Sequence, residues 1–305
     1  MLVSVVIPCY NVEKYVEQCL QSLLNQTHKD LQIICVNNNS TDNTLSVLTR
    51  FASEQRLIIT LVEESQKGAP YARNRGLQEV KGDYVQFLDA DDLLAPEKIA
   101  HQIKLINENN FPDIIAGDYY RQALDGSKKL YQVKHHDYWL ALLYTQLGIT
   151  SANLFKTTSV KNVGGFDVML KSSQEYALMF NMMCKGAVVL HDDQPFTIIR
   201  DRAEGAISQQ NAGENMERYL NLRIAIVKHL ASINTIEKMQ PFYQALFDAI
   251  RVLYKHNPTL AIKAFKYNLP QGFKPNTSAA TTASYAMLFK LFGFECTEKI
   301  KALVK

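Results

Sequence analysis

The sequence predicts an α/β fold in which a mainly parallel sheet is covered by helices on both faces and is followed by a smaller helical part. Short β-branched runs alternate with longer helical patterns through the first 90 residues, as in successive βαβ units. The composition, 47% hydrophobic and 21% charged with 13 Gly and 9 Pro, is that of an ordinary folded protein. At 305 residues the chain exceeds what one core usually fills, so we expect two domains.

Each apolar run in the first part of the chain is the expected position of a strand. The runs are VSVVIP, LQIICV, LIITLVE and YVQFLDA, and the helical patterns between them are NVEKYVEQCLQSLLNQ, STDNTLSVLTRFASEQ and ARNRGLQEV. We expect Asn11 to cap the first helix and Pro96 to lie in the first turn of a later one. Apolar side chains recur at helical spacing from Val12 to Leu24, which predicts that the first helix packs on the sheet.

The alternation of strands and helices weakens after Phe111. Strand patterns become shorter there, and the last part of the chain reads as helices alone. We therefore expect a main domain at residues 1–215, with a regular half at 1–110 and a less regular half at 111–215, and a helical extension at 216–305.

The helical extension is the basic part of the chain. The whole protein has a net charge of +3, but residues 219–305 hold 12 Lys or Arg against 4 Asp or Glu. One interpretation is an interfacial helix on anionic lipid, formed by Lys290, Lys299, Lys301 and Lys305 beside Phe289, Leu291, Phe292 and Phe294. The other is a small bundle that packs on the main domain or forms a homo-oligomer such as a dimer. The aromatic residues cluster and do not alternate with basic ones, so we expect no nucleic-acid partner.

The beginning of the chain and its cysteines both predict a cytoplasmic protein. MLVSVVIPCY has no basic leader and no small-residue cleavage site, and no apolar run approaches the roughly 18 residues that span a bilayer. The five cysteines are odd in number and lack CxxC spacing, which indicates reduced thiols and neither a disulfide framework nor a zinc site. The interfacial interpretation of the extension would place the protein on the inner face of the cell membrane.

Three carboxylates end the strand pattern at YVQFLDADD. Ligands of mainly parallel sheets bind at the carboxyl ends of strands, and Asp89 and Asp91 project to one side if the strand continues. A hard divalent cation, Mg²⁺ or Mn²⁺, fits such a pair. On this string alone, a turn with helix-capping Asp residues is an equal alternative. The sequence has no Walker A motif, and no GxGxxG opens a helix, which excludes the common kinase and dinucleotide-enzyme interpretations.

The order of three motifs resembles the family 2 glycosyltransferases. VSVVIPCYN is followed by a strand ending in NNNSTDNT and then by GAPYARNRGLQEVKGDYVQFLDADD. The resemblance is close over residues 3–110 and looser to about residue 210. It implies the Rossmann-like GT-A fold, with a nucleotide-binding half before an acceptor half. It also implies an inverting, metal-dependent transfer of a sugar from a nucleotide diphosphate sugar to a hydroxyl of a growing glycan, in synthesis of bacterial surface polysaccharide or lipopolysaccharide.

The same resemblance gives roles to residues around the acidic string. Asp91 is the expected metal ligand, and Asp89 faces the ribose or the donor sugar. Pro8 and Tyr10 form a wall of the nucleotide pocket, although Tyr10 has the alternative role of a core aromatic residue.

Lys67 and Arg73 lie in the segment that closes over the nucleotide, so both are expected to meet the diphosphate. The alternative for each is a solvated surface charge. One departure from the family concerns the base: members carry an Asp pair where this sequence has Asn37 and Asn38. An amide oxygen can accept the base N–H, so Asn38 is a predicted uracil contact and UDP the expected nucleotide. The alternative is that these residues only shape a tight turn.

Glu175 is the predicted general base, in the segment KSSQEYALMF. The family shows an acidic pair there, and Gln174 replaces one of its members. The alternative is a Glu placed in a first helical turn by the helix dipole. Asp167, in GGFD, is the second choice for the base. Arg200 and Arg202 precede EGAISQQN, a polar stretch that we expect to order over a bound donor.

A second class of function stays open. Asn37 and Asn38 also fit a non-catalytic module that binds a sugar nucleotide or a glycan. The intact DADD string and Glu175 favour the enzyme.

Overall fold

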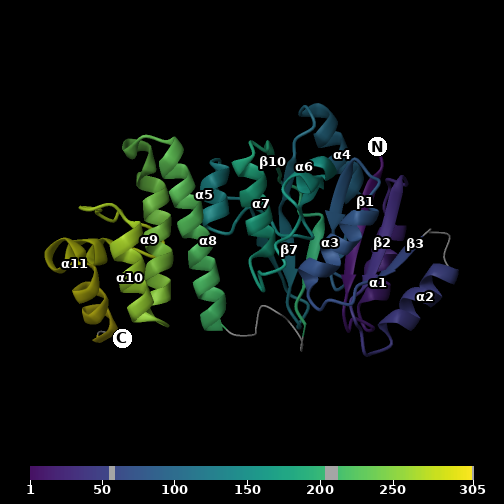
Figure 1. Cartoon of the computed structure of the whole chain (residues 1–305), viewed down its shortest axis with the longest axis horizontal. Coiled ribbons are helices and arrows are strands. Elements are labelled where there is room, and N and C mark those ends of the chain that lie inside the picture. Colours follow the sequence, from purple (N-terminus) through teal and green to yellow (C-terminus); the bar gives the residue numbers. More distant parts are fainter. Residues whose placement is uncertain (55–58, 203–211, 304–305) are drawn as a thin grey trace. The chain divides into compact units, whose positions relative to one another are not determined.

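The structure is a computed structural model that describes residues 1–54, 59–202 and 212–303. The chain forms two compact units, Met1–Ala206 and Ile207–Lys305 (Figure 1). The sequence-based division after residue 215 falls inside helix α8 (Ala212–Ile233), the first helix of the second unit.

The first unit is built on a seven-stranded sheet with the order β10-β6-β9-β4-β1-β2-β3. All neighbouring pairs in it are parallel except those of β9, which runs antiparallel to β4 and β6. This confirms the predicted, mostly parallel sheet. The strands are β1 (Val3–Cys9), β2 (Leu31–Asn37), β3 (Ile59–Glu63), β4 (Tyr84–Phe87), β6 (Ile114–Gly117), β9 (Leu154–Lys156) and β10 (Val189–Asp192).

Helices cover both faces of this sheet, because alternate residues of the central strand point to opposite sides. Val3, Val5 and Ile7 of β1 join a core that includes residues of α1, α2 and α4. Val6 points the other way, toward α3. The helices of the first unit are α1 (Val16–Leu24), α2 (Thr44–Glu54), α3 (Ala69–Glu79), α4 (Lys98–Glu108), α5 (Tyr138–Leu143), α6 (Thr157–Asn162) and α7 (Gln174–Cys184).

Helix α3 lies unusually close to the sheet because of Gly76. A Cβ at this position would lie 2.3 Å from Cγ1 of Val6 and 3.2 Å from Cγ2 of Val36, so any larger residue would push the helix away. This close approach fixes the position of α3, and therefore of Arg73, one turn earlier, relative to the strand ends.

The predicted cap of the first helix is wrong. Asn11 has a positive φ of 49°, and α1 begins only at Val16. The oxygen of the Asn11 side chain accepts from the backbone N–H of Thr41 at 2.8 Å, and the backbone N–H of Val12 donates to the hydroxyl of Thr44 at 2.8 Å. The segment after β1 therefore bonds to the loop after β2 and to the first residue of α2, and α1 starts only after these bonds.

A second, four-stranded sheet with the order β5-β11-β7-β8 extends the first unit. Its strands are β5 (Leu93–Leu94), β11 (Thr197–Arg200), β7 (Tyr119–Gln122) and β8 (Lys128–Tyr131). Strand β5 directly follows the acidic string, and β11 pairs with it antiparallel. This pairing brings Arg200 back to the carboxylates from more than 100 positions further along the chain.

The second unit is helical and has its own aromatic core. It contains α8, a short 3₁₀ helix η2 (Ile236–Met239), α9 (Gln240–Tyr254), α10 (Pro258–Asn268) and α11 (Ala283–Leu303). Phe247 of α9 is fully buried, and its ring contacts those of Phe265, Phe273, Tyr285, Phe289 and Phe294. No helix among the described residues has the length and apolar character needed to cross a membrane.

Candidate functional site

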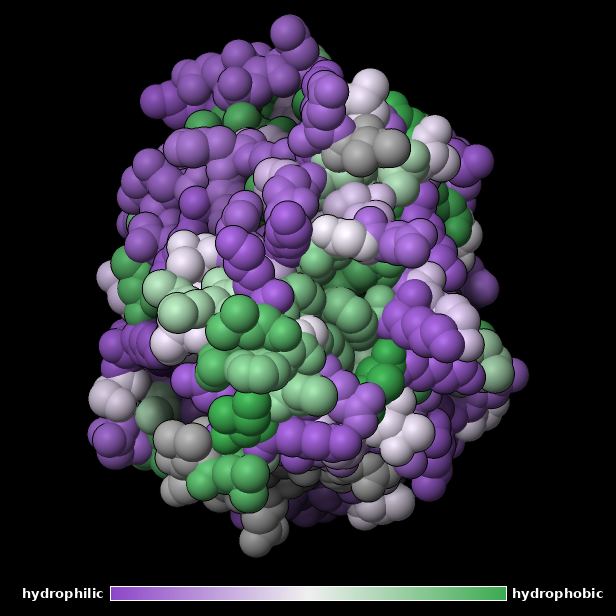
Figure 2. Space-filling view, turned by 90° about the vertical axis from the view of Figure 1, so that its left-hand side faces the viewer, coloured by the Kyte–Doolittle hydropathy of each residue, from purple (hydrophilic) through white to green (hydrophobic). Residues whose placement is uncertain are grey.

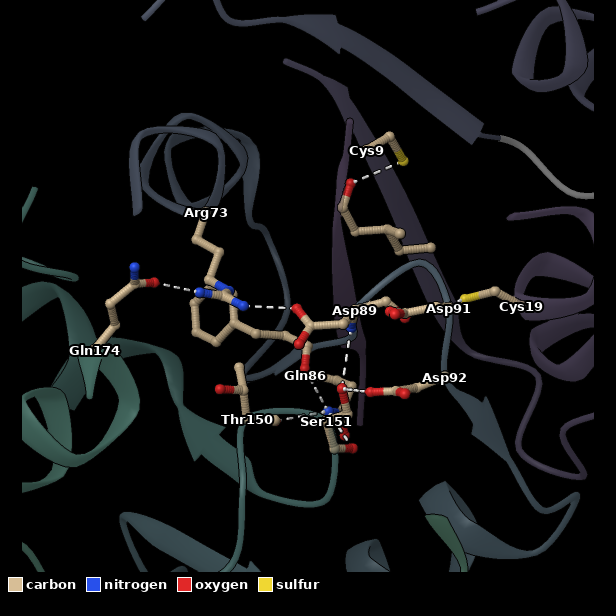
Figure 3. A network of polar contacts seen from close by, with 12 residues as sticks. Cys9, Cys19, Arg73, Gln86, Asp89, Asp91, Asp92, Thr150, Ser151 and Gln174 are labelled. Carbon is tan, nitrogen blue, oxygen red and sulfur yellow. Dashed lines mark hydrogen bonds and ion pairs between the residues drawn. The ribbon is translucent and has the colours of Figure 1, made fainter. Parts of the chain in front are cut away.

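The candidate site lies at the carboxyl edge of the seven-stranded sheet, where β1, β2 and β4 end at Cys9, Asn37 and Phe87. The acidic string follows β4 at this edge. Asp92, its innermost member, is 3% exposed. One carboxylate oxygen accepts from the Ser151 hydroxyl at 2.6 Å (Figure 3). The other accepts from the backbone N–H of Arg200 at 3.1 Å. Burial raises the pKa of Asp92 well above its usual value. With both carboxylate oxygens already bonded within the protein, Asp92 holds the acidic string in place.

Asp89 and Asp91 each pair with an arginine. The Nη2 of Arg73 lies 2.6 Å from Oδ1 of Asp89 (Figure 3), and the Nε of Arg202 pairs with Oδ2 of Asp91. Burial, and then the neighbouring charge of Asp89, raise the pKa of Asp91, whereas Arg202 lowers it. The two carboxylates therefore repel one another, and a cation between them would relieve this repulsion.

Arg73 links the acidic string to the start of α7. It is 6% exposed, and besides its bond to Asp89 its Nη1 donates to Oε1 of Gln174 at 2.7 Å. Its guanidinium lies 5.2 Å from the ring centroid of Phe166, and its buried Nε has no hydrogen-bond partner among the described residues. The interpretation of Arg73 as a solvated surface charge is wrong. The contact with a diphosphate stays a prediction.

Glu175 directly follows Gln174, in the first turn of α7. The residue before the helix, Ser173, has a positive φ of 59°, which turns the chain sharply into it. Glu175 is half-buried. Burial raises its pKa, the first-turn backbone and Arg73 lower it, and Asp89 raises it, so the carboxyl group lies within electrostatic reach of both Arg73 and Asp89. The base predicted from the sequence thus lies near the acidic string.

Asn38 directly follows β2 and is 3% exposed. Its side chain makes three hydrogen bonds to the backbone of the loop before α3. Its side-chain nitrogen donates to the carbonyl oxygens of Glu64 at 2.9 Å and Gln66 at 2.7 Å, and its oxygen accepts from the N–H of Gly68 at 2.8 Å. The turn-shaping role is therefore present. An aspartate could not donate to the two carbonyls, which explains the amide here. A base contact at the remaining lone pair of the oxygen stays a prediction.

The other predicted nucleotide contacts lie at the same edge. Tyr10 directly follows β1 and is 48% exposed, so its alternative role as a core aromatic residue is wrong. Pro8 lies near the end of β1 and is partly buried. Lys67 is exposed in the loop that leads into α3. Asp167, the second choice for the base, is exposed and accepts from the backbone N–H of Met169 at 2.9 Å.

Two residues of this site were missed in the sequence. Ser151, which is 1% exposed, donates to Asp92 and accepts from the N–H of Asp89 at 3.0 Å. Asn74 donates to the carbonyl of Phe166 at 2.7 Å and accepts from its N–H at 2.8 Å. The run TSAN, four small or polar residues directly before an apolar strand, is the signal that could have indicated Ser151.

The end of β10 and the segment after β11 complete the surroundings of the site. His191 does not meet the acidic string, since its Nε2 lies 2.8 Å from a carboxylate oxygen of Asp118. The EGAISQQN stretch, residues 204–211, lies outside the described residues. Arg200 and Arg202 before it are described, and their guanidinium groups lie 5.6 and 5.2 Å from the ring centroid of Tyr15.

The chemistry of the side chains at this edge fits a divalent cation. Within the described ranges, no group of three His, Cys, Asp or Glu side chains forms a complete metal cage. Asp89 and Asp91 supply the carboxylate oxygens that Mg²⁺ and Mn²⁺ prefer, and such ions complete their shell with water and phosphate oxygens. A cation at Asp91 would have to displace the guanidinium of Arg202.

A mostly parallel sheet with the acidic string directly after β4 is the arrangement expected of a GT-A transferase. The chain belongs to glycosyltransferase family 2, since the family description "Glycosyl transferase family 2" matches residues 4–166. An uncharacterized glycosyltransferase of Rickettsia typhi is 30% identical over 264 residues, covering 84% of this chain and 80% of that protein. A poly(ribitol-phosphate) beta-glucosyltransferase of Bacillus spizizenii is 29% identical over 192 residues, covering 61% of this chain and 30% of that protein.

Solved structures share the fold. The structure of Staphylococcus aureus TarS 1–349 in complex with UDP-GlcNAc matches with a TM-score of 0.66 at 19% identity, covering 89% of this chain and 77% of that one. The mannosyltransferase PcManGT of Pyrobaculum calidifontis, in complex with GDP-Man and Mn²⁺, matches with a TM-score of 0.58 at 19% identity, covering 98% and 83%. The expected GT-A fold is confirmed, and the chain is a glycosyltransferase.

Proposed function

We propose that this glycosyltransferase is inverting and transfers a hexose or N-acetylhexosamine from a UDP-sugar to a hydroxyl of a growing or lipid-linked glycan in cell-surface polysaccharide or lipopolysaccharide synthesis. One observation carries the proposal: Arg73 bonds both Asp89 of the acidic string and Gln174, the neighbour of Glu175. A donor-side carboxylate and a candidate base, 86 positions apart in sequence, are thereby held in one site. The UDP-GlcNAc complex of TarS supports the choice of UDP, and the poly(ribitol-phosphate) glucosyltransferase relative supports a polymer as the carrier of the acceptor hydroxyl.

The residues of the site fit direct displacement. Bound Mg²⁺ or Mn²⁺, held by Asp91 beside Asp89, would stabilise the negative charge that develops on the departing diphosphate. Glu175 takes the proton of the acceptor hydroxyl as its oxygen attacks the anomeric carbon. The new bond forms on the side opposite the breaking bond to the diphosphate, so the anomeric configuration inverts. Burial raises the pKa of Glu175 toward neutral pH, where a general base is more effective.

The donor and the metal are tested by thermal stabilisation. We expect UDP, and not GDP, CDP or TDP, to raise the melting temperature of the full chain when Mn²⁺ is present, because a ligand that binds only the folded state stabilises it by mass action. Asp91→Ala should abolish this shift. If another nucleotide stabilises the protein instead, that nucleotide is the donor's and the assignment of UDP is wrong. If none of them stabilises it, the non-catalytic glycan-binding alternative is favoured.

The base is tested by turnover. Glu175→Gln should keep the UDP-induced thermal shift and lower kcat by about 10² to 10⁴-fold, the usual contribution of a general base. Asp167→Asn is the matched control, since Asp167 bonds only its own turn in the described structure. If Glu175→Gln retains wild-type turnover and Asp167→Asn loses it, the base is Asp167.

The state of the thiols supports a cytoplasmic site of transfer. All five cysteines are free, and Cys9, Cys19 and Cys35 are buried. Free thiols are usual in proteins of a reducing compartment, where disulfides rarely persist.

A further inference from the structure

The last helix, α11, has an inner and an outer face with different roles. Gly293, with a φ of 70°, divides it into two segments. Phe289 and Phe294 point into the aromatic core around Phe247 and are only 9% and 4% exposed, so their predicted place at a lipid interface is wrong. The outer face remains for contact with another molecule.

That outer face carries large apolar side chains. Met287, Leu291 and Phe292 are 68%, 64% and 53% exposed, and Met287 and Leu291 are one helical turn apart on one side of α11. We call these three residues, together with Lys290 between them, the α11 patch. Figure 2 faces this end of the second unit and shows hydrophobic side chains gathered among hydrophilic ones. Exposed apolar groups rimmed by polar ones mark interaction sites.

The surroundings of the α11 patch are basic. Residues 255–303 contain seven lysines and only two glutamates. Glu298 is buried and bonded to Arg251 at 2.7 Å, and Glu295 bonds Lys299 at 2.7 Å, so neither offers an unpaired negative charge to a partner. Lys290 is exposed within the patch itself, and Lys263 and Lys266 are exposed on α10.

We propose that the α11 patch docks on an anionic lipid surface. Met287, Leu291 and Phe292 would enter the boundary between headgroups and acyl chains, while Lys290 meets the anionic headgroups. The positive charge around the α11 patch favours anionic lipid over a second copy of the chain. In a symmetric dimer, Lys290 and its neighbouring lysines would face the same lysines of the other copy. The inference stands independently of the donor and of the base.

Deleting the end of the chain would not test this proposal. Residues 270–305 include Tyr285, Phe289 and Phe294, which pack on Phe247, and their loss would open the core of the second unit. Point variants on exposed residues avoid this difficulty.

The test is flotation of the full-length protein with vesicles of phosphatidylcholine alone or mixed with phosphatidylglycerol. We expect the wild type to float with the mixed vesicles and to be released by high salt. The double variant Leu291→Gln, Phe292→Gln should lower the partition coefficient on the order of a hundredfold, and Lys290→Gln about fivefold. Leu124→Gln is the matched control, because Leu124 is 69% exposed in the first unit.

Two readouts separate binding from folding and from catalysis. All variants should keep the wild-type melting temperature and its shift with UDP and Mn²⁺, since the altered side chains are exposed. Failure of the wild type to float on mixed vesicles, or unchanged flotation of the double variant, overturns the proposal. A wild-type dimer in light scattering that the double variant converts to a monomer, without flotation, would assign the α11 patch to a second copy.

Discussion

Arg73 is the residue whose contacts unite the candidate site. Arg73→Met should remove the partner of Asp89 and the donor to Gln174 together. We expect a loss of about 2 kcal/mol in the free energy of unfolding, less than for a fully buried pair because the Asp89 side chain is 37% exposed. Urea denaturation measures this loss. The value of kcat should also fall, because the segment that carries Glu175 loses the hydrogen bond between Arg73 and Gln174.

A matched control lies two positions along the same helix. Arg75 bonds Glu79 at 2.6 Å on α3, a partly exposed pair one turn apart whose side chains are 30% and 39% exposed. Arg75→Met should therefore cost only about 0.5 kcal/mol. Equal losses for the two variants would mean that Arg73 contributes no more than a surface charge.

Residues such as Arg73 show where prediction from the sequence ends. The types and places of Asp89, Asp91 and Glu175 followed from motifs, because strand ends and family motifs are local in sequence. The hydrogen-bond partners of the site residues could not be predicted in this way. Ser151 bonds Asp92 across 59 positions of the sequence, and Asn74 bonds Phe166 across 92. Such pairings depend on the place of β9 in the sheet and on the packing of α3 against it, which no local pattern encodes.

At the scale of elements, helix α4 buries a lysine against the sheet. Lys98 is 1% exposed and donates to the buried side chain of Gln86. Burial lowers the pKa of Lys98 to about 7, whereas in the unfolded chain it is about 10.4. Between these values the unfolded chain holds a proton that the folded protein lacks, so stability rises with pH by at most about 1.4 kcal/mol per unit. Below pH 7 both states hold the proton, and this slope disappears.

The variant Lys98→Met should remove this slope and stabilise the protein at pH 7. The measurement is the free energy of unfolding in urea from pH 6.5 to 9.5, taken as the difference between variant and wild type. Lys104→Met is the control, because the Lys104 side chain is 70% exposed on the same helix. A difference that stays constant with pH would show that Lys98 remains charged in the folded protein.

The elements themselves were largely predictable. The alternation of β-branched runs and helical patterns predicted β1, β2, β3 and β4 with α1, α2 and α3 between them, since the period of apolar residues differs between strands and helices. The start of α1 was not predictable, because a bond that Asn11 accepts from Thr41 and one that Val12 donates to Thr44 replaced the expected cap. A tertiary contact here overrides a local preference.

At the scale of the whole molecule, the two units have separate cores, so we expect two unfolding transitions in calorimetry. Phe247→Ala should lower the transition of the second unit, with a cost of about 3–5 kcal/mol for the lost aromatic contacts. UDP with Mn²⁺ should raise only the other transition. Phe292→Ala, at a 53% exposed position, should leave both nearly unchanged. One transition that responds to both Phe247→Ala and UDP would mean that the units unfold together.

The hydrogen bonds of Asn38 also bear on how this sequence can evolve. A single mutation to aspartate, the residue that the family resemblance leads us to expect in relatives, would set a carboxylate against the carbonyl oxygens of Glu64 and Gln66, 2.9 and 2.7 Å from the present donor. The exchange becomes tolerable only when the backbone of residues 64–68 changes as well. Position 38 and this loop should therefore covary among relatives, and ancestors that pass from one state to the other should change the loop first.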